Sequence, residues 1–264
     1  MILNSEVNQL SSFENFAKEA MRIIEAADRR QIPLRLMGGA AIRMHCNRFQ
    51  DLYETLGRTP KHDMDFVTYG KFRPLTKRLM TELGYTPYVS LMMTGATGRN
   101  RQIFNDAEGN KAIDIFFDKL QMCHTIDFHQ RLEKDSPTIP LAELLLQKMQ
   151  IVELNEKDIQ DTIVLLQEHS LDSHDNETIN MDQLARALGD DWGFYYTVTT
   201  NLRRVKDMLP RYAAIDGQNQ LDIAEKIERL LARIEEEPKT LPWKLRAKIG
   251  TSKKWYTVVE EVQR

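Results

Sequence analysis

The chain has 264 residues, 42% hydrophobic and 28% charged, with a formal net charge of −3 at pH 7. This is the composition of a globular protein with one large or two smaller domains, and the near-neutral charge excludes a general attraction to nucleic acid or anionic membranes. With no apolar run near ~20 residues, no recognisable signal peptide and only two cysteines (Cys46 and Cys123), the sequence predicts a reduced, cytoplasmic protein that does not enter membranes.

The chain up to about residue 134 is typical of mixed helices and strands. Helical spacing of apolar residues begins after SSFENF, which favours a helix over 11–30 starting at Ser11 or Ser12. The further expected elements are a strand at 34–37, a Gly38–Gly39 turn opening a helix at 40–46, a strand at 63–69, a helix near 72–83 ending before Gly84, a strand at 88–93, and a hairpin of strands 101–104 and 111–118.

The remainder of the chain is helical in its spacing. One long helical pattern runs over 138–169 with a break at Asn155, where Asn155 and Asp158 fit an N-cap with an acidic partner three residues on. Further helices are expected near 181–188, 193–209, 221–237 and 243–262, with polar connectors at 173–178 and 215–220. The predicted fold class is therefore α/β, a mixed sheet flanked by helices and followed by a helical domain, with domains 1–134 and 135–264.

Three aspartates lie within the predicted strands. Because side chains alternate across a strand, Asp63 and Asp65 share one face, about 6.6 Å apart, while Met64 and Phe66 occupy the other. Two carboxylates so placed repel each other unless a cation lies between them, and Mg²⁺ prefers such oxygen ligands. If the strand containing Asp114 is a neighbour with a matching face, the three carboxylates form the cluster that two-metal phosphoryl or nucleotidyl transfer requires.

The Gly38–Gly39 turn has the features of a phosphate-binding turn. A strand, two glycines and a helix start place backbone N–H groups where they can face an anion, and glycine lets a phosphate approach without a Cβ clash. A triphosphate would then lie between this turn and the metal ions. An ordinary tight turn is the alternative for the glycines, and an exposed, inert strand edge is the alternative for Asp63 and Asp65.

This ordered set resembles the nucleotidyltransferase fold of the DNA polymerase beta superfamily, and is most similar to the minimal, toxin-like nucleotidyltransferases of abortive-infection systems. The resemblance covers 34–118 by motif and extends loosely to about 169. It implies an NTP and Mg²⁺ as ligands, Asp63 and Asp65 as shared metal ligands, and Asp114 as the third carboxylate near the acceptor oxygen. It also suggests that Lys148 reaches the triphosphate, with Lys157 and Asp161 as weaker site candidates.

Several residues near these motifs have two interpretations. Arg101, like Arg99, either binds phosphate or is a solvated loop arginine, and Arg58 and Lys61 raise the same question. Lys148 either reaches the triphosphate or extends to the surface, and we interpret Asp158 as structural. Asp118 is the alternative to Asp114 as the third carboxylate, because both lie on the same face of the strand. We favour Asp114, because Asp118 lies near the strand end.

Two further groups of residues could bind a ligand, but we expect a structural role for both. Cys123, His124 and His129 lack a second pair of metal ligands, so we expect packing and polar surface rather than a zinc site. The segment 239–264 mixes basic residues with Trp243, Trp255 and Tyr256, and we favour a packed helix with a solvated basic face over a nucleic-acid grip.

The expected function is Mg²⁺-dependent transfer of a nucleoside monophosphate from an NTP to a hydroxyl on RNA, a protein or a small molecule. The alternative is a catalytically silent nucleotide-binding or interaction module on the same fold. A third, weaker hypothesis is an RNA-binding helical protein.

Overall fold

In a computed structural model, the chain is described at residues 2–46, 48, 50–56, 64–88, 100–107 and 112–259. Its residues form two compact units. The first comprises Met1–Met44, Thr59–Leu120 and Asp127–Pro140, and the second comprises His45–Arg58, Gln121–Ile126 and Leu141–Arg264. The second unit therefore takes two short segments from the first half of the chain.

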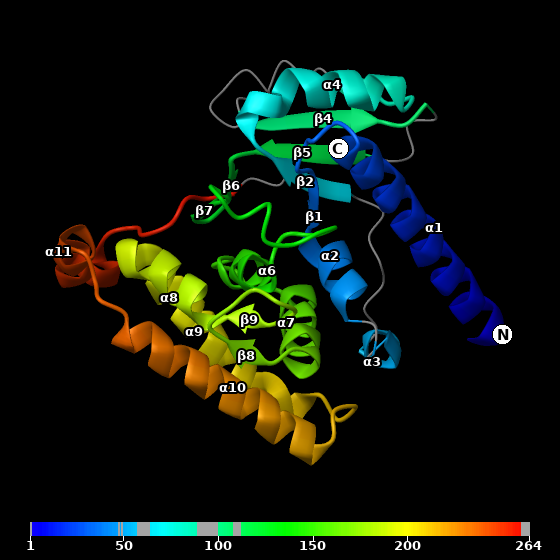
Figure 1. The fold of residues 1–264 in the computed structure, drawn as a ribbon. Coiled ribbons are helices and arrows are strands. Elements are labelled where there is room, and N and C mark those ends of the chain that lie inside the picture. The colour runs from blue at the N-terminus through cyan, green and yellow to red at the C-terminus, as the bar shows by residue number, and fades with distance from the viewer. Residues whose placement is uncertain are drawn as a thin grey trace. The chain divides into compact units, whose positions relative to one another are not determined.

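A five-stranded mixed sheet forms the centre of the first unit (Figure 1). The strand order is β1-β2-β5-β4-β3, and only β2 and β5 run parallel to each other. The strands are β1 (Arg35–Met37), β2 (Met64–Thr68), β3 (Thr86–Tyr88), β4 (Arg101–Asn105) and β5 (Ala112–Phe117). The predicted strands at 34–37 and 63–69 and the predicted hairpin of 101–104 with 111–118 are confirmed. The strand predicted at 88–93 falls mostly on residues outside the described part of the chain.

Helices and apolar side chains complete this unit. The helices are α1 (Ile2–Asp28), α2 (Gly38–His45), the 3-10 turn η1 (Gly70–Phe72) and α4 (Arg73–Glu82). One stripe of α1 is buried, and its spacing is that of a helix face packed on a core; it consists of Ala20, Ile23, Ile24 and Ala27. Gly84 follows α4 with φ +93°, the left-handed conformation expected at a helix end.

The predicted start of the first helix is wrong. The helix begins at Ile2 and runs through Ser11 and Ser12 without a break. Neither Gly nor Pro occurs between Ile2 and Asp28, so nothing in this stretch stops the helix, and the capping pattern at Ser11 is not used.

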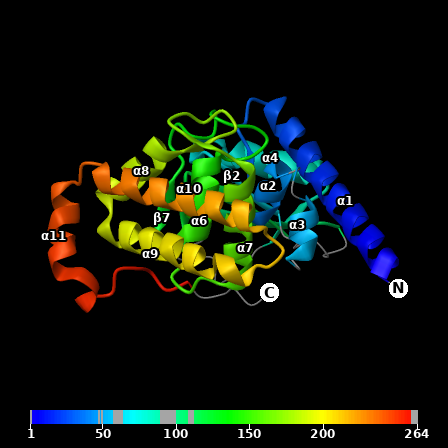
Figure 2. The same cartoon turned by 90° about the horizontal axis from the view of Figure 1, so that it is seen from below.

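The second unit is helical around one central helix. In α6 (Leu141–Met149) all residues but one are buried, as expected for a helix surrounded by others, and it contacts α7, α8 and α9. Figure 2 shows α8, α9 and α10 alongside one another. The other helices are α3 (Gln50–Thr55), α7 (Glu156–Glu168), α8 (Met181–Asp190), α9 (Trp192–Met208), η3 (Leu209–Arg211), α10 (Gly217–Glu236), α11 (Leu241–Ile249) and η4 (Gly250–Ser252). The expected N-cap at Asn155 is confirmed, because its side chain accepts from the backbone N–H of Asp158.

The predicted helix over 243–262 is wrong beyond Ile249. α11 ends at Gly250, whose φ is +60°, and no α-helix follows within the described residues up to 259. Instead, Trp255 Nε1 donates to Thr197 Oγ1 of α9 (3.1 Å), and Thr257 N donates to Cys123 O (3.0 Å). The second contact gives the backbone N–H of Thr257 an acceptor that a continued helix would have supplied locally.

Four short strands and one short helix were not predicted. They are β6 (Lys119–Gln121), β7 (Thr125–Asp127), β8 (Leu171–Asp172), β9 (Ile179–Asn180) and α3.

In the parts of the chain that are described, no helix is both long and apolar enough to span a bilayer.

Candidate active site

Asp65 and Asp114 are direct partners on neighbouring strands. In the parallel pair of β2 and β5, the register sets Asp65 opposite Asp114. Residues paired in this way lie about 4.8 Å apart and project to the same side of the sheet. The adjacency on which the predicted carboxylate cluster depends is therefore present for these two residues. Asp63 lies outside the described residues.

Gly38 lies directly against Asp65. β1 pairs with β2 so that Met37 faces Asp65, and Gly38 follows at once as the first residue of α2. A Cβ added to Gly38 would lie 3.5 Å from Asp65 Oδ2, and its φ of +76° is one that side-chain-bearing residues rarely adopt. The glycine turn and the carboxylate thus meet at one end of β1. Gly39 is the second residue of α2 and belongs to the same turn.

Arg101 forms an ion pair with Asp114. Its Nη2 donates to Asp114 Oδ2, and its guanidinium lies over the ring of Phe116, 5.2 Å from the centroid. Asp114 is only 2% exposed, and a carboxylate this deeply buried needs a counter-charge. Among the described residues, the buried Nε–H of Arg101 meets no hydrogen-bond acceptor. Arg101 is therefore not a solvated loop residue, and its ion pair with Asp114 does not occupy all of its hydrogen-bond donors.

Asp118, the alternative to Asp114, makes a structural contact. Its Oδ1 accepts from the backbone N–H of Gly70 (2.9 Å), and its own φ is +62°. A Cβ on Gly70 would come within 2.5 Å of Asp118 Oδ2, so the two residues fit each other closely. Asp118 thus anchors the turn after β2.

Lys148 is buried in the second unit between two aspartates. Its Nζ lies 3.1 Å from Asp158 Oδ1 and 2.7 Å from Asp161 Oδ2. Burial alone would lower the pKa of Lys148, but the attraction of Asp161 and Asp158 exceeds it and raises that pKa above its ordinary value. Lys148 does not extend into solvent. Asp161, fully buried, and Asp158 form a compact charged triad with it.

The other predicted candidates either lie outside the described residues or make packing contacts. Arg58, Lys61 and Arg99 are outside the described part of the chain. Cys123 and His124 are buried, and His124 Nε2 contacts Thr197 Oγ1 (2.8 Å), which agrees with the predicted packing role. Two aromatic rings of the C-terminal segment pack on α9: that of Trp243 lies 5.1 Å from the ring of Tyr195, and that of Trp255 lies 5.2 Å from the ring of Tyr196.

One group of chemically competent residues was missed from the sequence. His45, His169 and Glu177 come together in the second unit, although His45 and Glu177 are 132 positions apart. No short motif joins them, so only a three-dimensional contact brings them together.

The chain was compared with known proteins. It matches no protein-family model and no curated protein. Among solved structures, it is similar to the antibiotic-resistance factor ANT(2'')-Ia, at 13% identity and a TM-score of 0.37 over 60% of this chain and 83% of that one. It is also similar to an antigenic nucleotidyltransferase-like protein from Paracoccidioides brasiliensis, at 11% identity and a TM-score of 0.38 over 86% and 95% of the two chains. Both TM-scores lie below 0.5, so the assignment of function depends on the geometry of this chain alone.

Proposed function

We propose that the chain is a nucleotidyltransferase that moves a nucleoside monophosphate from an NTP to a hydroxyl acceptor and releases pyrophosphate. The observation that carries the proposal is the pairing of Asp65 with Asp114 on adjacent parallel strands, next to the Gly38 turn. The bond between the α-phosphorus and the pyrophosphate oxygen breaks, and a bond to the acceptor oxygen forms.

The donor atoms suit Mg²⁺. Asp65 and Asp114, with Asp63 as the third ligand, offer only carboxylate oxygens, the ligands that this hard cation prefers. When bound, the ions would neutralise the triphosphate and lower the pKa of the acceptor hydroxyl. The turn at Gly38 and Gly39 would hold phosphate oxygens next to them, because no side chain of the turn blocks their approach.

Arg101 is proposed to bind phosphate through the part of its guanidinium that Asp114 leaves unused. Its buried Nε–H lacks an acceptor within the described residues, and a phosphate oxygen would supply one. Lys148 lies in the second unit, where its pairing with Asp158 and Asp161 keeps it protonated.

A catalytically silent nucleotide-binding module is the second candidate, and the Arg101–Asp114 ion pair favours it. An arginine already neutralises the buried carboxylate, so a cation is not needed there for stability. In this case an NTP would bind without turnover.

An assay with NTPs labelled at the α-phosphate, Mg²⁺ and candidate acceptors (total RNA, protein extract, aminoglycoside-like alcohols) separates the two. We expect label transfer by the wild type and a loss of at least about 100-fold in Asp65→Asn, the scale on which one electrostatic contact to the transition state acts. Asp127→Asn, at an exposed residue of β7, is the matched control and should keep full activity.

The outcomes are distinct. Equal transfer by Asp65→Asn and the wild type would contradict the enzyme proposal. Calorimetric binding of NTP without any transfer would instead support the silent module.

A further inference from the structure

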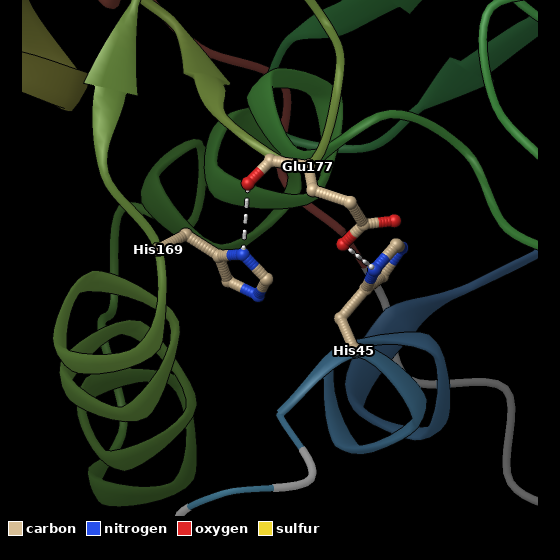
Figure 3. A group of neighbouring side chains, drawn as sticks. All are labelled: His45, His169 and Glu177. Atoms are coloured by element: carbon tan, nitrogen blue, oxygen red, sulfur yellow. Dashed lines mark hydrogen bonds and ion pairs between the residues drawn. The ribbon is translucent and has the colours of Figure 1, made fainter.

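His45, His169 and Glu177 form a compact group in the second unit (Figure 3). His45 is the last residue of α2, His169 directly follows α7, and Glu177 lies in the segment between β8 and β9. One ligand atom from each residue lies within 4.8 Å of the other two. No part of the function proposed above uses these residues.

The distance between His45 and Glu177 fits a shared metal ion. His45 Nδ1 lies 3.3 Å from Glu177 Oε2. Two ligand atoms bound to one tetrahedral Zn²⁺ with bonds of about 2.0–2.1 Å are about 3.3–3.4 Å apart. The two side chains are therefore already separated by the length of one edge of such a site.

The ring of His169 is held as a metal ligand is usually held. Its Nδ1 lies 3.2 Å from the backbone carbonyl of Glu177, to which it donates. This hydrogen bond fixes the tautomer and leaves the lone pair on Nε2, the arrangement found at most metal-ligating histidines. Glu177 thus serves the group twice, through its carbonyl and its carboxylate, from a backbone φ of +54° that is uncommon for glutamate.

Burial and access also suit an ion site. His169 is 6% exposed and the His45 side chain 7%, whereas the Glu177 side chain is 70% exposed. The imidazoles are therefore fixed by packing, while the carboxylate side is open to solvent and gives an ion a way in. The thiol of Cys46 adjoins the group, with its Sγ 3.9 Å from His169 Nε2.

We propose that His45, His169 and Glu177 bind a Zn²⁺ ion that fastens the segment 173–178 to the ends of α2 and α7. Two imidazoles and one carboxylate are typical zinc ligands, and Mg²⁺ or Ca²⁺ would prefer oxygen atoms alone. Three protein ligands leave one position of the tetrahedron for water.

The experiment uses the full chain after removal of metal with a chelator and exchange into chelator-free buffer. Zn²⁺ is titrated by calorimetry, and Co²⁺ by the visible absorption of its four-coordinate complexes. We expect one ion per chain in the wild type and at least about tenfold weaker binding in Glu177→Gln, because even outer-shell partners of a metal affect affinity 10- to 100-fold.

Two variants serve as controls. Glu153→Gln makes the same chemical change at another exposed position, and His174→Ala removes an exposed histidine from the same segment; both should bind Zn²⁺ like the wild type. Because Glu177 is exposed, its variant should melt in chelator at the wild-type temperature, while Zn²⁺ should raise the melting temperature more in the wild type.

Absence of binding by the wild type would overturn the proposal. Equal affinity of Glu177→Gln and the wild type would do so too, as would loss of binding in His174→Ala alone, which would place the ion on the surface of the segment.

Discussion

We expect the contributions of Arg101 and Asp114 to the free energy of unfolding to depend strongly on each other. Asp114 is 2% exposed, and Arg101 reaches it diagonally across the β4–β5 pair, in which Arg101 faces Phe116 and Ile103 faces Asp114. Removing one partner of such a pair leaves an uncompensated buried charge, whereas replacing both with apolar groups removes the need for compensation.

We therefore expect Arg101→Met to lower the free energy of unfolding by about 3–5 kcal/mol, and the double variant Arg101→Met/Asp114→Leu to regain most of that loss. Urea unfolding of the wild type, both single variants and the double variant measures this coupling. Additive effects of the two substitutions would show that Arg101 does not compensate the buried charge of Asp114.

The Arg101→Met variant also tests whether a cation binds at Asp114. If Asp114 is a metal ligand, Mg²⁺ or Mn²⁺ should stabilise Arg101→Met more than the wild type, because the ion replaces the missing guanidinium. An identical response of both proteins would argue for the silent module.

At the scale of elements, the C-terminal segment is held against α9 by a close backbone contact. The backbone oxygen of Trp255 lies only 2.4 Å from the position that a Cβ on Gly193 would take, and the ring of Trp192 stacks on that of Tyr196 at 5.2 Å. Only glycine allows the chain to approach so closely at this point.

Gly193→Ala should therefore displace the segment around Trp255, so that its backbone opens more readily and trypsin cleaves faster after the exposed Lys253 and Lys254. Gly217→Ala is the matched control: it also lies in the first turn of a helix, but no atom is within 4 Å of its added Cβ. Faster cleavage in Gly193→Ala alone is the expected result. Equal cleavage in both variants would mean that the contact does not retain the segment.

We expect His124 to make the helical unit sensitive to mild acid. Burial lowers the pKa of His124, and the nearby Asp191 only partly opposes this effect. The ring packs on Phe194 at 5.1 Å, and Nε2 faces Thr197 Oγ1. The folded chain therefore binds this proton less readily than the unfolded chain does, and unfolding takes up a proton.

The free energy of unfolding should thus be highest above about pH 6.5, the ordinary histidine pKa, and should fall as the pH drops below it. Urea unfolding at pH 7.5 and 5.5 should show a smaller decrease in His124→Leu than in the wild type. The exposed His129 provides the control, since His129→Leu should keep the wild-type decrease. An unchanged decrease in His124→Leu would contradict the assignment.

At the scale of the molecule, the second unit depends on segments distant in sequence. Arg48 Nε donates to Glu168 Oε1 (2.6 Å), and Gln160 Nε2 donates to the carbonyl of Leu56 (2.8 Å). The segment Gln121–Ile126 adds the contacts of Cys123 and His124 with the C-terminal part of the chain. These contacts span 73 positions or more, and the two units alternate along the chain, so no single cut separates them intact.

A fragment of residues 141–264 should consequently unfold at a lower temperature than this unit does in the full chain, and less cooperatively. Circular dichroism on heating measures this, together with tryptophan fluorescence, which includes that of Trp255 beside Thr197. A fragment as stable as the full chain would show that the segments from the first half add nothing to the unit.

The sequence by itself determined the local features. Periodic apolar residues predicted the strands around Asp65 and Asp114 and nearly every helix, because alternation and 3.6-residue spacing reflect burial of one face. Gly38, Gly84 and Asn155 were recognised because turn and cap residues act on their own backbone. Mixed α/β character followed from these elements.

Only the tertiary structure decided which distant groups meet. The opposition of Asp65 and Asp114, the counter-charge from Arg101, and the triad of Lys148 with Asp158 and Asp161 depend on strand order and helix packing. The same holds for the non-helical end of the chain on α9 and for the group of His45, His169 and Glu177. Such contacts arise from the burial of whole surfaces, and a single sequence records no spacing for residues that are neighbours only after folding.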